Sequence, residues 1–172
     1  MKSVEQLLKQ QCQKTINMKL LIITQSGPTG LNQQVALACK HIAEEVKGPS
    51  IVDVKIDNAS GFAPSAVSAY THVIFVVPEW NGSFPHTFKS LIDGSGYPSA
   101  FKKKKVLMVG TSATDFGNIM GITHLQHILQ WVGAFVDSKR ICIPRVQEFV
   151  DPIDGFRDVE DRLYKAIKKF LQ

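Results

Sequence analysis

One stretch decides the fold: Val73-Ile74-Phe75-Val76-Val77, which leads directly into Pro78-Glu79-Trp80-Asn81-Gly82-Ser83. A short apolar run bounded by a turn is typical of a strand that is buried on both faces of a sheet. Asn-Gly is a strong turn signal, so we expect the chain to reverse sharply where this strand ends. In open α/β sheets, ligands bind at the carboxyl ends of strands. Exposed backbone amides and the ring of Trp80 would therefore lie at a ligand-binding edge.

The same residues have a plainer interpretation as a surface turn that feeds a helix. Ser83 would then be the N-cap of that helix, and Pro85 would lie in its first turn. The two interpretations are compatible, because a loop that binds a ligand can also begin a helix.

Strands and helices alternate along the rest of the chain. Apolar runs and helical periodicity predict strands at 19–24, 51–56, 73–77, 105–110 and 138–143, helices at 32–46, 84–91, 121–131 and 153–171, and a short helix or turn at 63–70. Alternation of this kind gives a parallel sheet covered by helices on both faces, and right-handed crossovers leave few topologies. We predict an α/β fold with a five-stranded parallel sheet in the order 2-1-3-4-5.

Length and composition indicate a globular protein. The chain has 172 residues, of which 44% are apolar, and this suits one domain over residues 18–172. Residues 1–17 form an amphipathic segment that we expect to be a helical extension. They lack the apolar core and cleavage site of a signal peptide, and no run of the chain approaches the roughly 20 apolar residues of a membrane span. We therefore expect a cytoplasmic protein with no membrane partner.

Cysteine usage and charge exclude further classes. Cys12, Cys39 and Cys142 are odd in number and far apart, which argues against a disulfide framework and against a zinc site. Net charge is +5 and the pI is about 9.1, with basic clusters at 102–105 and 165–169. No nucleic-acid-binding motif accompanies these lysines, so we interpret them as solvated surface and expect no nucleic-acid partner.

Counted along the chain, the first loop with chemical character precedes the first helix, and Pro78 to Ser83 is the second loop. The first loop reads Thr24-Gln25-Ser26-Gly27-Pro28-Thr29-Gly30-Leu31-Asn32. A glycine-bearing loop at a helix N-terminus presents free N–H groups and the positive end of the helix dipole, which suits a phosphate. Its hydroxyl groups can add hydrogen bonds. The alternative is an ordinary connection between a strand and a helix, since Gly, Pro and Thr are common turn residues.

Pro78 to Ser83 closely resembles the P-E-Y-N-G-S segment of the NAD(P)H-dependent FMN reductases, with Trp80 where Tyr is usual. This family is flavodoxin-like and includes quinone, azo-dye and chromate reductases. The resemblance extends over residues 18 to about 145. It implies a flavodoxin-like three-layer sandwich that binds FMN, with backbone amides of this segment at the polar edge of the flavin and the Trp80 ring near the flavin or a neighbouring subunit.

The first loop is a hybrid of two patterns. The reductases have G-S-x-R-x-x-S-x-N here, and Asn32 matches the final Asn, whereas Gly27 and Gly30 replace the Arg and the second Ser. Residues 24–29 also resemble the T-x-T-G-x-T phosphate loop of flavodoxins. Loss of the Arg removes a charge-assisted phosphate contact worth about 1.5–3 kcal/mol.

The third loop, residues 110–118, resembles the V-G-V-S-G-G-R-x-G-G segment of the same reductases. Ser112, Phe116 and Gly117 keep the pattern. Ala113 and Thr114 replace glycines, while Asp115 and Met120 stand where arginines are common. Those arginines could hold the phosphates of a nicotinamide dinucleotide or make subunit contacts, so their loss bears on NADPH use.

The resemblance implies an enzyme that passes a hydride from NAD(P)H C4 to flavin N5 and then electrons to a small-molecule acceptor such as a quinone, azo compound or flavin. NAD(P)H is the co-substrate, no side-chain acid or base is required, and no metal is expected. The family is usually dimeric or tetrameric, which implies a homodimer or homotetramer. The implied FMN-binding residues are Thr24, Gln25, Ser26, Gly27, Thr29, Gly30, Leu31, Asn32, Pro78, Glu79, Trp80, Asn81, Gly82, Ser112, Ala113, Thr114, Phe116 and Gly117.

Two other classes stay open. A flavodoxin-like binding or regulatory module without turnover would fit the replaced arginines at Gly27 and Met120. An electron carrier of the flavodoxin type fits less well, because flavodoxins are commonly acidic and this chain is basic.

Overall fold

A computed structural model describes residues 18–150 and 156–172. Its five strands form one parallel sheet in the order β2-β1-β3-β4-β5, which confirms the predicted topology. The strands are β1 (Met18–Thr24), β2 (Val52–Asn58), β3 (His72–Pro78), β4 (Lys105–Thr111) and β5 (Phe135–Ile143).

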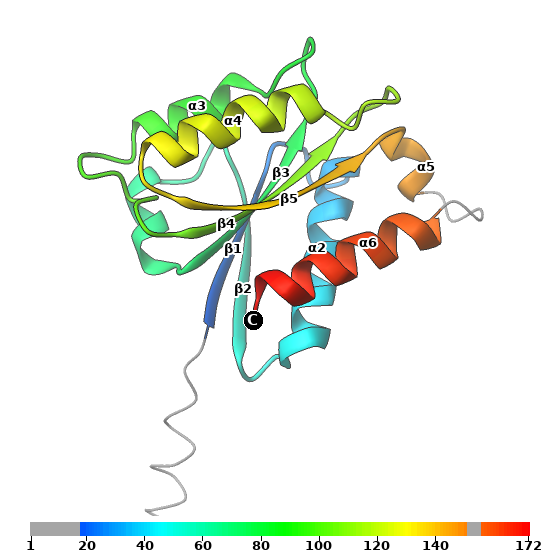
Figure 1. Cartoon of the computed structure of the whole chain (residues 1–172), viewed down its shortest axis with the longest axis horizontal. Coiled ribbons are helices and arrows are strands. Elements are labelled where there is room, and N and C mark those ends of the chain that lie inside the picture. The colour runs from blue at the N-terminus through cyan, green and yellow to red at the C-terminus, as the bar shows by residue number, and fades with distance from the viewer. Residues whose placement is uncertain (1–17, 151–155) are drawn as a thin grey trace, which may run out of the picture.

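Helices cover both faces of the sheet, so the three-layer sandwich is also confirmed (Figure 1). Helices α2 and α6 lie against one face, and the helices η1, α3 and α4 lie against the other. The helices are α2 (Leu31–Lys47), the 3₁₀ helix η1 (Pro64–Ala69), α3 (His86–Asp93), α4 (Ile119–Trp131), α5 (Val146–Val150) and α6 (Phe156–Phe170).

Burial explains why the central strands are continuous apolar runs. Every residue of β3 is buried, and alternate side chains enter the two cores on opposite faces. Ile74 packs with the α2 and α6 layer, whereas Phe75 packs with the other layer against Phe88 and Phe101. Cys39 of α2 is a fully buried core thiol, and burial raises its pKa to about 12.

The C-terminal third departs from the predicted elements. Strand β5 begins at Phe135 rather than 138. Its pairing with β4 shifts register between Val106 and Met108, so β5 has more residues than β4 over this part of the ladder. The short helix α5 was not predicted. Helix α6 is described from Phe156, and its predicted start at 153 lies outside the described residues. The expected N-terminal helical extension over residues 1–17 lies outside the described residues.

The sheet brings three loops to one edge. Strands β1, β3 and β4 are neighbours and parallel, with Thr24 paired to Val76 and Pro78 paired to Thr111. The loops after Thr24, Pro78 and Thr111 therefore leave the sheet side by side at its carboxyl edge. This is the edge at which open α/β sheets bind ligands.

Candidate functional site

The second loop is a tight hairpin turn. Trp80 and Ser83 exchange backbone hydrogen bonds of 2.9 and 3.0 Å, and Asn81 and Gly82 between them have φ values of 50° and 74°. Positive φ at both central residues is the requirement of a type I′ turn, which explains the Asn-Gly pair. The turn holds the Trp80 ring 48% exposed, with its centroid 6.5 Å from that of His86.

This turn corrects one expectation from the sequence. Ser83 does not cap the following helix, because α3 begins at His86 and its N-cap is Pro85, which makes no side-chain cap hydrogen bond. The Ser83 backbone is instead committed to the hairpin with Trp80.

The first loop ends at an uncapped helix N-terminus. Gly30 is the N-cap of α2 and supplies no side-chain hydrogen bond, while its carbonyl accepts from the amides of Gln33 and Gln34. The amides of Leu31 and Asn32 have no partner among the described residues, as is usual for the first turn of a helix. Free amides at the positive end of a 17-residue helix are suited to an anion.

Two buried polar atoms at the same place also have no partner. Thr24 Oγ1 and Gln25 Oε1 are shielded from solvent and make no hydrogen bond within the described parts of the chain. A buried polar atom without a partner costs about 1–3 kcal/mol, so such atoms at a loop edge are typical of a binding site. Free amides and an unpaired hydroxyl group are the donors that a phosphate accepts from, so this loop fits the phosphate of FMN.

The third loop is held by Ser112. Its amide donates to the Ile143 carbonyl at 3.1 Å, and its hydroxyl group donates to the Thr114 carbonyl at 2.8 Å and accepts from the Gly117 amide at 2.9 Å. This network buries Ser112 and Gly117 and leaves Ala113, Thr114 and Phe116 exposed. The Phe116 side chain is 71% exposed at the tip of the loop.

Asn118 joins the third loop to the second. Its side-chain amide donates to the carbonyls of Val77 and Pro78, both at 3.0 Å, and its Oδ1 caps α4 by accepting from Gly121 N. The φ of Asn118 is 59°, a conformation that Asn tolerates better than most residues. A Cβ on Gly121 would lie 2.7 Å from the backbone of Ser83, so glycine allows the two loops to approach closely.

Thr111 joins β4 to the other two loops. Its hydroxyl group donates to Asn32 Oδ1 at 2.5 Å, and its carbonyl accepts from the Glu79 amide at 2.8 Å. The three predicted loops are therefore connected by hydrogen bonds at one edge of the sheet.

The predicted site residues divide by exposure. Those that fix the loops are buried, namely Thr24, Pro78, Ser112 and Gly117. Those at half exposure are Gln25, Ser26, Gly30, Leu31, Asn32 and Glu79, and those facing solvent are Gly27, Thr29, Trp80, Asn81, Gly82, Ala113, Thr114 and Phe116.

Three residues at this edge were not among the predicted site residues. The Asn58 side chain, at the end of β2, donates to the Ser26 carbonyl at 2.5 Å and so supports the first loop. Asn118 supports the second and third loops, and its place directly before a helix was a usable N-cap signal. Arg145 had no such signal in the sequence. It lies beside the third loop only because β5, which precedes it, pairs with β4 in the sheet.

Arg145 places a positive charge beside the third loop. Its guanidinium group pairs with Asp115 at 3.1 Å and with Glu148 at 3.2 Å, and its amide donates to the Thr114 carbonyl at 2.9 Å. The pairs are exposed and worth about 0–1 kcal/mol each. The backbone bond to Thr114 is the firmer link between the end of β5 and this loop.

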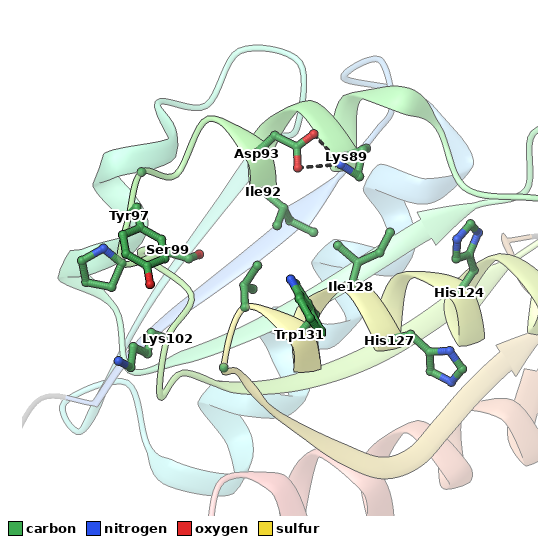
Figure 2. Close-up of a pocket in the computed structure, with 14 residues that line it drawn as sticks. Lys89, Ile92, Asp93, Tyr97, Ser99, Lys102, His124, His127, Ile128 and Trp131 are labelled. Carbon is green, nitrogen blue, oxygen red and sulfur yellow. Dashed lines mark hydrogen bonds and ion pairs between the residues drawn. The ribbon is translucent and has the colours of Figure 1, made fainter.

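A separate cavity of about 840 Å³ lies between α3 and α4, away from the loops (Figure 2). Ile92, Ile128 and Trp131 line it, together with Tyr97 and Lys102 from the connection between α3 and β4. None of the predicted site residues contributes to this cavity.

Two further observations concern the described residues as a whole. No helix within residues 18–150 and 156–172 is long and apolar enough to cross a membrane. In the same ranges, no group of three or more His, Cys, Asp and Glu side chains is placed to hold a metal ion.

Residues 57–145, just over half of the chain, match the model of the NADPH-dependent FMN reductase family. The chain belongs to this family. The match spans β3, β4 and the second and third loops, which are the segments that Thr111 and Asn118 hold together. No curated protein shows a significant sequence match to the chain.

Solved structures of flavoproteins share the fold. FerB, a flavoenzyme NAD(P)H:(acceptor) oxidoreductase from Paracoccus denitrificans, is 16% identical with a TM-score of 0.75 over 90% of this chain and 95% of that chain. The NADH:FMN oxidoreductase EMOB in its apo form is 15% identical with a TM-score of 0.72 over 90% and 88%. Flavodoxin 2 from Bacillus cereus is 17% identical with a TM-score of 0.69 over 89% and 97%. At these identities the likeness shows the flavodoxin-like fold alone.

Proposed function

We propose that this member of the FMN reductase family binds FMN at the three-loop edge and passes reducing equivalents from NAD(P)H to a small-molecule acceptor. The observation that carries the proposal is the group of unsatisfied polar atoms in the first loop. The amides of Leu31 and Asn32, together with Thr24 Oγ1 and Gln25 Oε1, belong to a loop at the same sheet edge as the other two loops and have no partner within the described residues.

Each loop has a distinct role in this proposal. Residues 24–32 hold the phosphate through amides and hydroxyl groups, with Ser26, Thr29 and Gly30 at the mouth of the loop. The hairpin presents the backbone N–H groups of Asn81 and Gly82 and the Trp80 ring to the flavin, because the amides of Glu79 and Trp80 are already bonded within the protein. Ser112 fixes the third loop, whose Ala113, Thr114, Phe116 and Gly117 form the opposite wall.

The bound flavin supplies the redox chemistry, because it can accept a hydride from NAD(P)H and return two electrons to a quinone, azo compound or flavin. The chain then has to position the ring and exclude water on one side, and it needs no acid or base side chain. Both substrates would use the same exposed face in turn, which gives ping-pong kinetics. The side chains of Trp80 and Phe116 are exposed on the second and third loops, where they could contact such substrates.

We also propose that the protein is a homodimer or homotetramer, as the family resemblance implies. A cytoplasmic location is part of the same proposal and is supported by the composition of the chain.

The proposal is tested on purified protein. We expect a yellow protein that releases FMN on denaturation and oxidises NADH or NADPH when a quinone is added. FAD as the sole released flavin would contradict the single phosphate loop, since the chain has no G-x-G-x-x-G motif for a dinucleotide. Apoprotein that takes up no FMN would refute the proposal.

The alternative is a flavodoxin-like binding or regulatory module without turnover. It is favoured by the absence of a basic side chain from the first loop, where Gly27 replaces the family arginine. A colourless protein that takes up no FMN would support this alternative. A yellow protein that does not oxidise NAD(P)H would instead indicate an electron carrier.

A further inference from the structure

The charged side chains of the three loops are all carboxylates. Glu79 lies at the base of the hairpin, and Asp115 lies on the exposed part of the third loop, between the buried Ser112 and Gly117. None of the three loops contains a lysine or an arginine. The whole chain has a net charge of +5, so the acidic character of these loops runs against its composition.

Arg145 is the cation beside the third loop, and two carboxylates already bind it. Its guanidinium group lies 3.1 Å from Asp115 and 3.2 Å from Glu148. Its backbone is fixed to the same loop, because its amide donates to the Thr114 carbonyl at 2.9 Å. We call Glu79, Asp115, Arg145 and Glu148 the acidic rim. Three carboxylates and one guanidinium group give this rim a net charge of −2.

The acidic rim is open to solvent. The side chains of Asp115, Arg145 and Glu148 are 75%, 54% and 62% exposed. Ion pairs as exposed as these contribute little to stability. Their main physical effect is on the electrostatic potential at the edge of the site, where charges of one sign attract or repel an incoming ligand.

The two possible nicotinamide donors differ in charge. NADPH has one more phosphate group than NADH, on the 2′ position of its adenosine ribose. Proteins hold such a group by charge-assisted hydrogen bonds from arginine or lysine. The acidic rim offers carboxylates instead, and its guanidinium group is already paired with two of them. The free 2′-hydroxyl group of NADH can donate a hydrogen bond to a carboxylate, whereas a 2′-phosphate is repelled by it.

We infer that the acidic rim makes this site select NADH over NADPH, and that Asp115 and Glu148 contribute by holding Arg145 in ion pairs. The inference rests on the proposed function and goes further by choosing between the two donors. An independent mark of a ligand at the same edge is Thr24 Oγ1, which is fully buried and has no partner within the described residues.

The first test compares the kcat/KM values of NADH and NADPH with one quinone acceptor at low ionic strength. We expect wild type to favour NADH by at least about tenfold, because like charges brought together in a binding site are costly. Asp115→Asn removes one carboxylate from Arg145 and should raise kcat/KM for NADPH about three- to tenfold, with little change for NADH. Asp115→Asn combined with Glu148→Gln releases Arg145 from both ion pairs and should make NADPH the better donor.

Two results of this test would overturn the inference. One is a wild type that uses NADPH as well as NADH, or better. The other is a folded double variant with unchanged selectivity. Asp53→Asn is the matched control, because Asp53 is exposed near the start of β2, in register with Lys19 at the opposite edge of the sheet. It removes the same charge away from the loops and should leave selectivity unchanged. Equal effects of Asp53→Asn and Asp115→Asn would show that net charge, and not the rim, sets the preference.

Direct binding separates this inference from the proposed function. Calorimetric titration of the full-length protein with NAD⁺ and with NADP⁺, before and after addition of FMN, gives the two dissociation constants without turnover. We expect NAD⁺ to bind more tightly to wild type, and the double variant to reverse this order. Selective NAD⁺ binding by a protein that shows no turnover would refute the proposed function and leave the inference in place. In such a protein, binding of neither nucleotide, or tighter binding of NADP⁺, would overturn the inference.

Discussion

The Thr111 hydroxyl group, at the end of β4, donates a hydrogen bond of 2.5 Å to Asn32 Oδ1 in the first turn of α2. The two residues are 79 positions apart in the sequence, and Thr111 is almost fully buried. This bond fixes the N-terminus of α2 relative to the central strand from which the third loop leaves. It therefore relates the proposed phosphate position to the proposed flavin position.

Removing this bond should loosen the site. Thr111→Val keeps the shape of the side chain and leaves Asn32 Oδ1 without its donor. We expect the free energy of unfolding to fall by about 1 kcal/mol and FMN to bind about three- to tenfold more weakly. Urea unfolding and fluorescence titration of the apoprotein measure the two effects. Thr111→Ser restores the hydroxyl group and should restore both values, and a Ser variant as weak as Val would show that the bond has no role.

The first loop has room for the arginine that it lacks. Gly27 has no positive φ, and a Cβ placed there would meet no atom within 4 Å. We predict that Gly27→Arg tightens FMN binding by up to about tenfold, equivalent to roughly 1.4 kcal/mol, through a charge-assisted contact with the phosphate. Titration of apoprotein with FMN gives the value.

Gly61→Arg is the matched control for this substitution. Gly61 also has open space around its Cβ position and no positive φ, so it adds the same charge on another connection. It should change FMN affinity little. Equal gains in both variants would mean that net charge, and not a contact in the first loop, is responsible.

The Trp80 ring should report flavin binding. It is 48% exposed on a two-residue turn, whereas Trp131 lies on the outer side of α4. We predict that FMN quenches Trp80 fluorescence and that Trp80→Ala removes most of the quenching and alters acceptor turnover. The loss of stability should be small, because the side chain is outside the core. Unchanged quenching and turnover in Trp80→Ala would show that the segment is only a turn.

Acid should destabilise the fold through His72. Burial, with smaller contributions from the charges of Lys105 and Lys47, lowers the pKa of His72 from 6.5 to about 4. Its Nε2 is buried without a partner in the described structure, and its ring packs edge-on against Phe170 at 5.3 Å. The unfolded chain binds the proton more tightly, so stability present above pH 6.5 is lost as the pH falls toward 4.

The loss between pH 7 and pH 5 should be roughly 1–2 kcal/mol. Urea unfolding at the two pH values measures it. His72→Gln cannot titrate, so its stability should fall by that much less over the same interval. An equal fall in wild type and His72→Gln would show that other groups cause the acid sensitivity.

The central part of the fold was predictable because its signals are local. Buried parallel strands are continuous apolar runs, and the glycines and prolines that follow them end those runs. The start of β5 was missed because residues 135–137 are partly exposed at the sheet edge and lack that pattern. Helix α5 was missed because five residues carry too little periodicity to distinguish a helix from a turn.

The sequence by itself determined the strands, the three loops and the family, because each depends on residue types that are neighbours in the chain. The strand order followed from these elements, because right-handed crossovers leave few topologies. Only the tertiary structure decided how the loops are joined. The bonds from Thr111 to Asn32 and from Asn118 to Pro78 connect residues 79 and 40 positions apart, and no local pattern encodes them. The tertiary structure also gave the two exposed tryptophans different surroundings: Trp80 lies at the site edge, and Trp131 lies beside an apolar cavity. Burial and contact depend on which elements pack together, and this is a property of the whole fold.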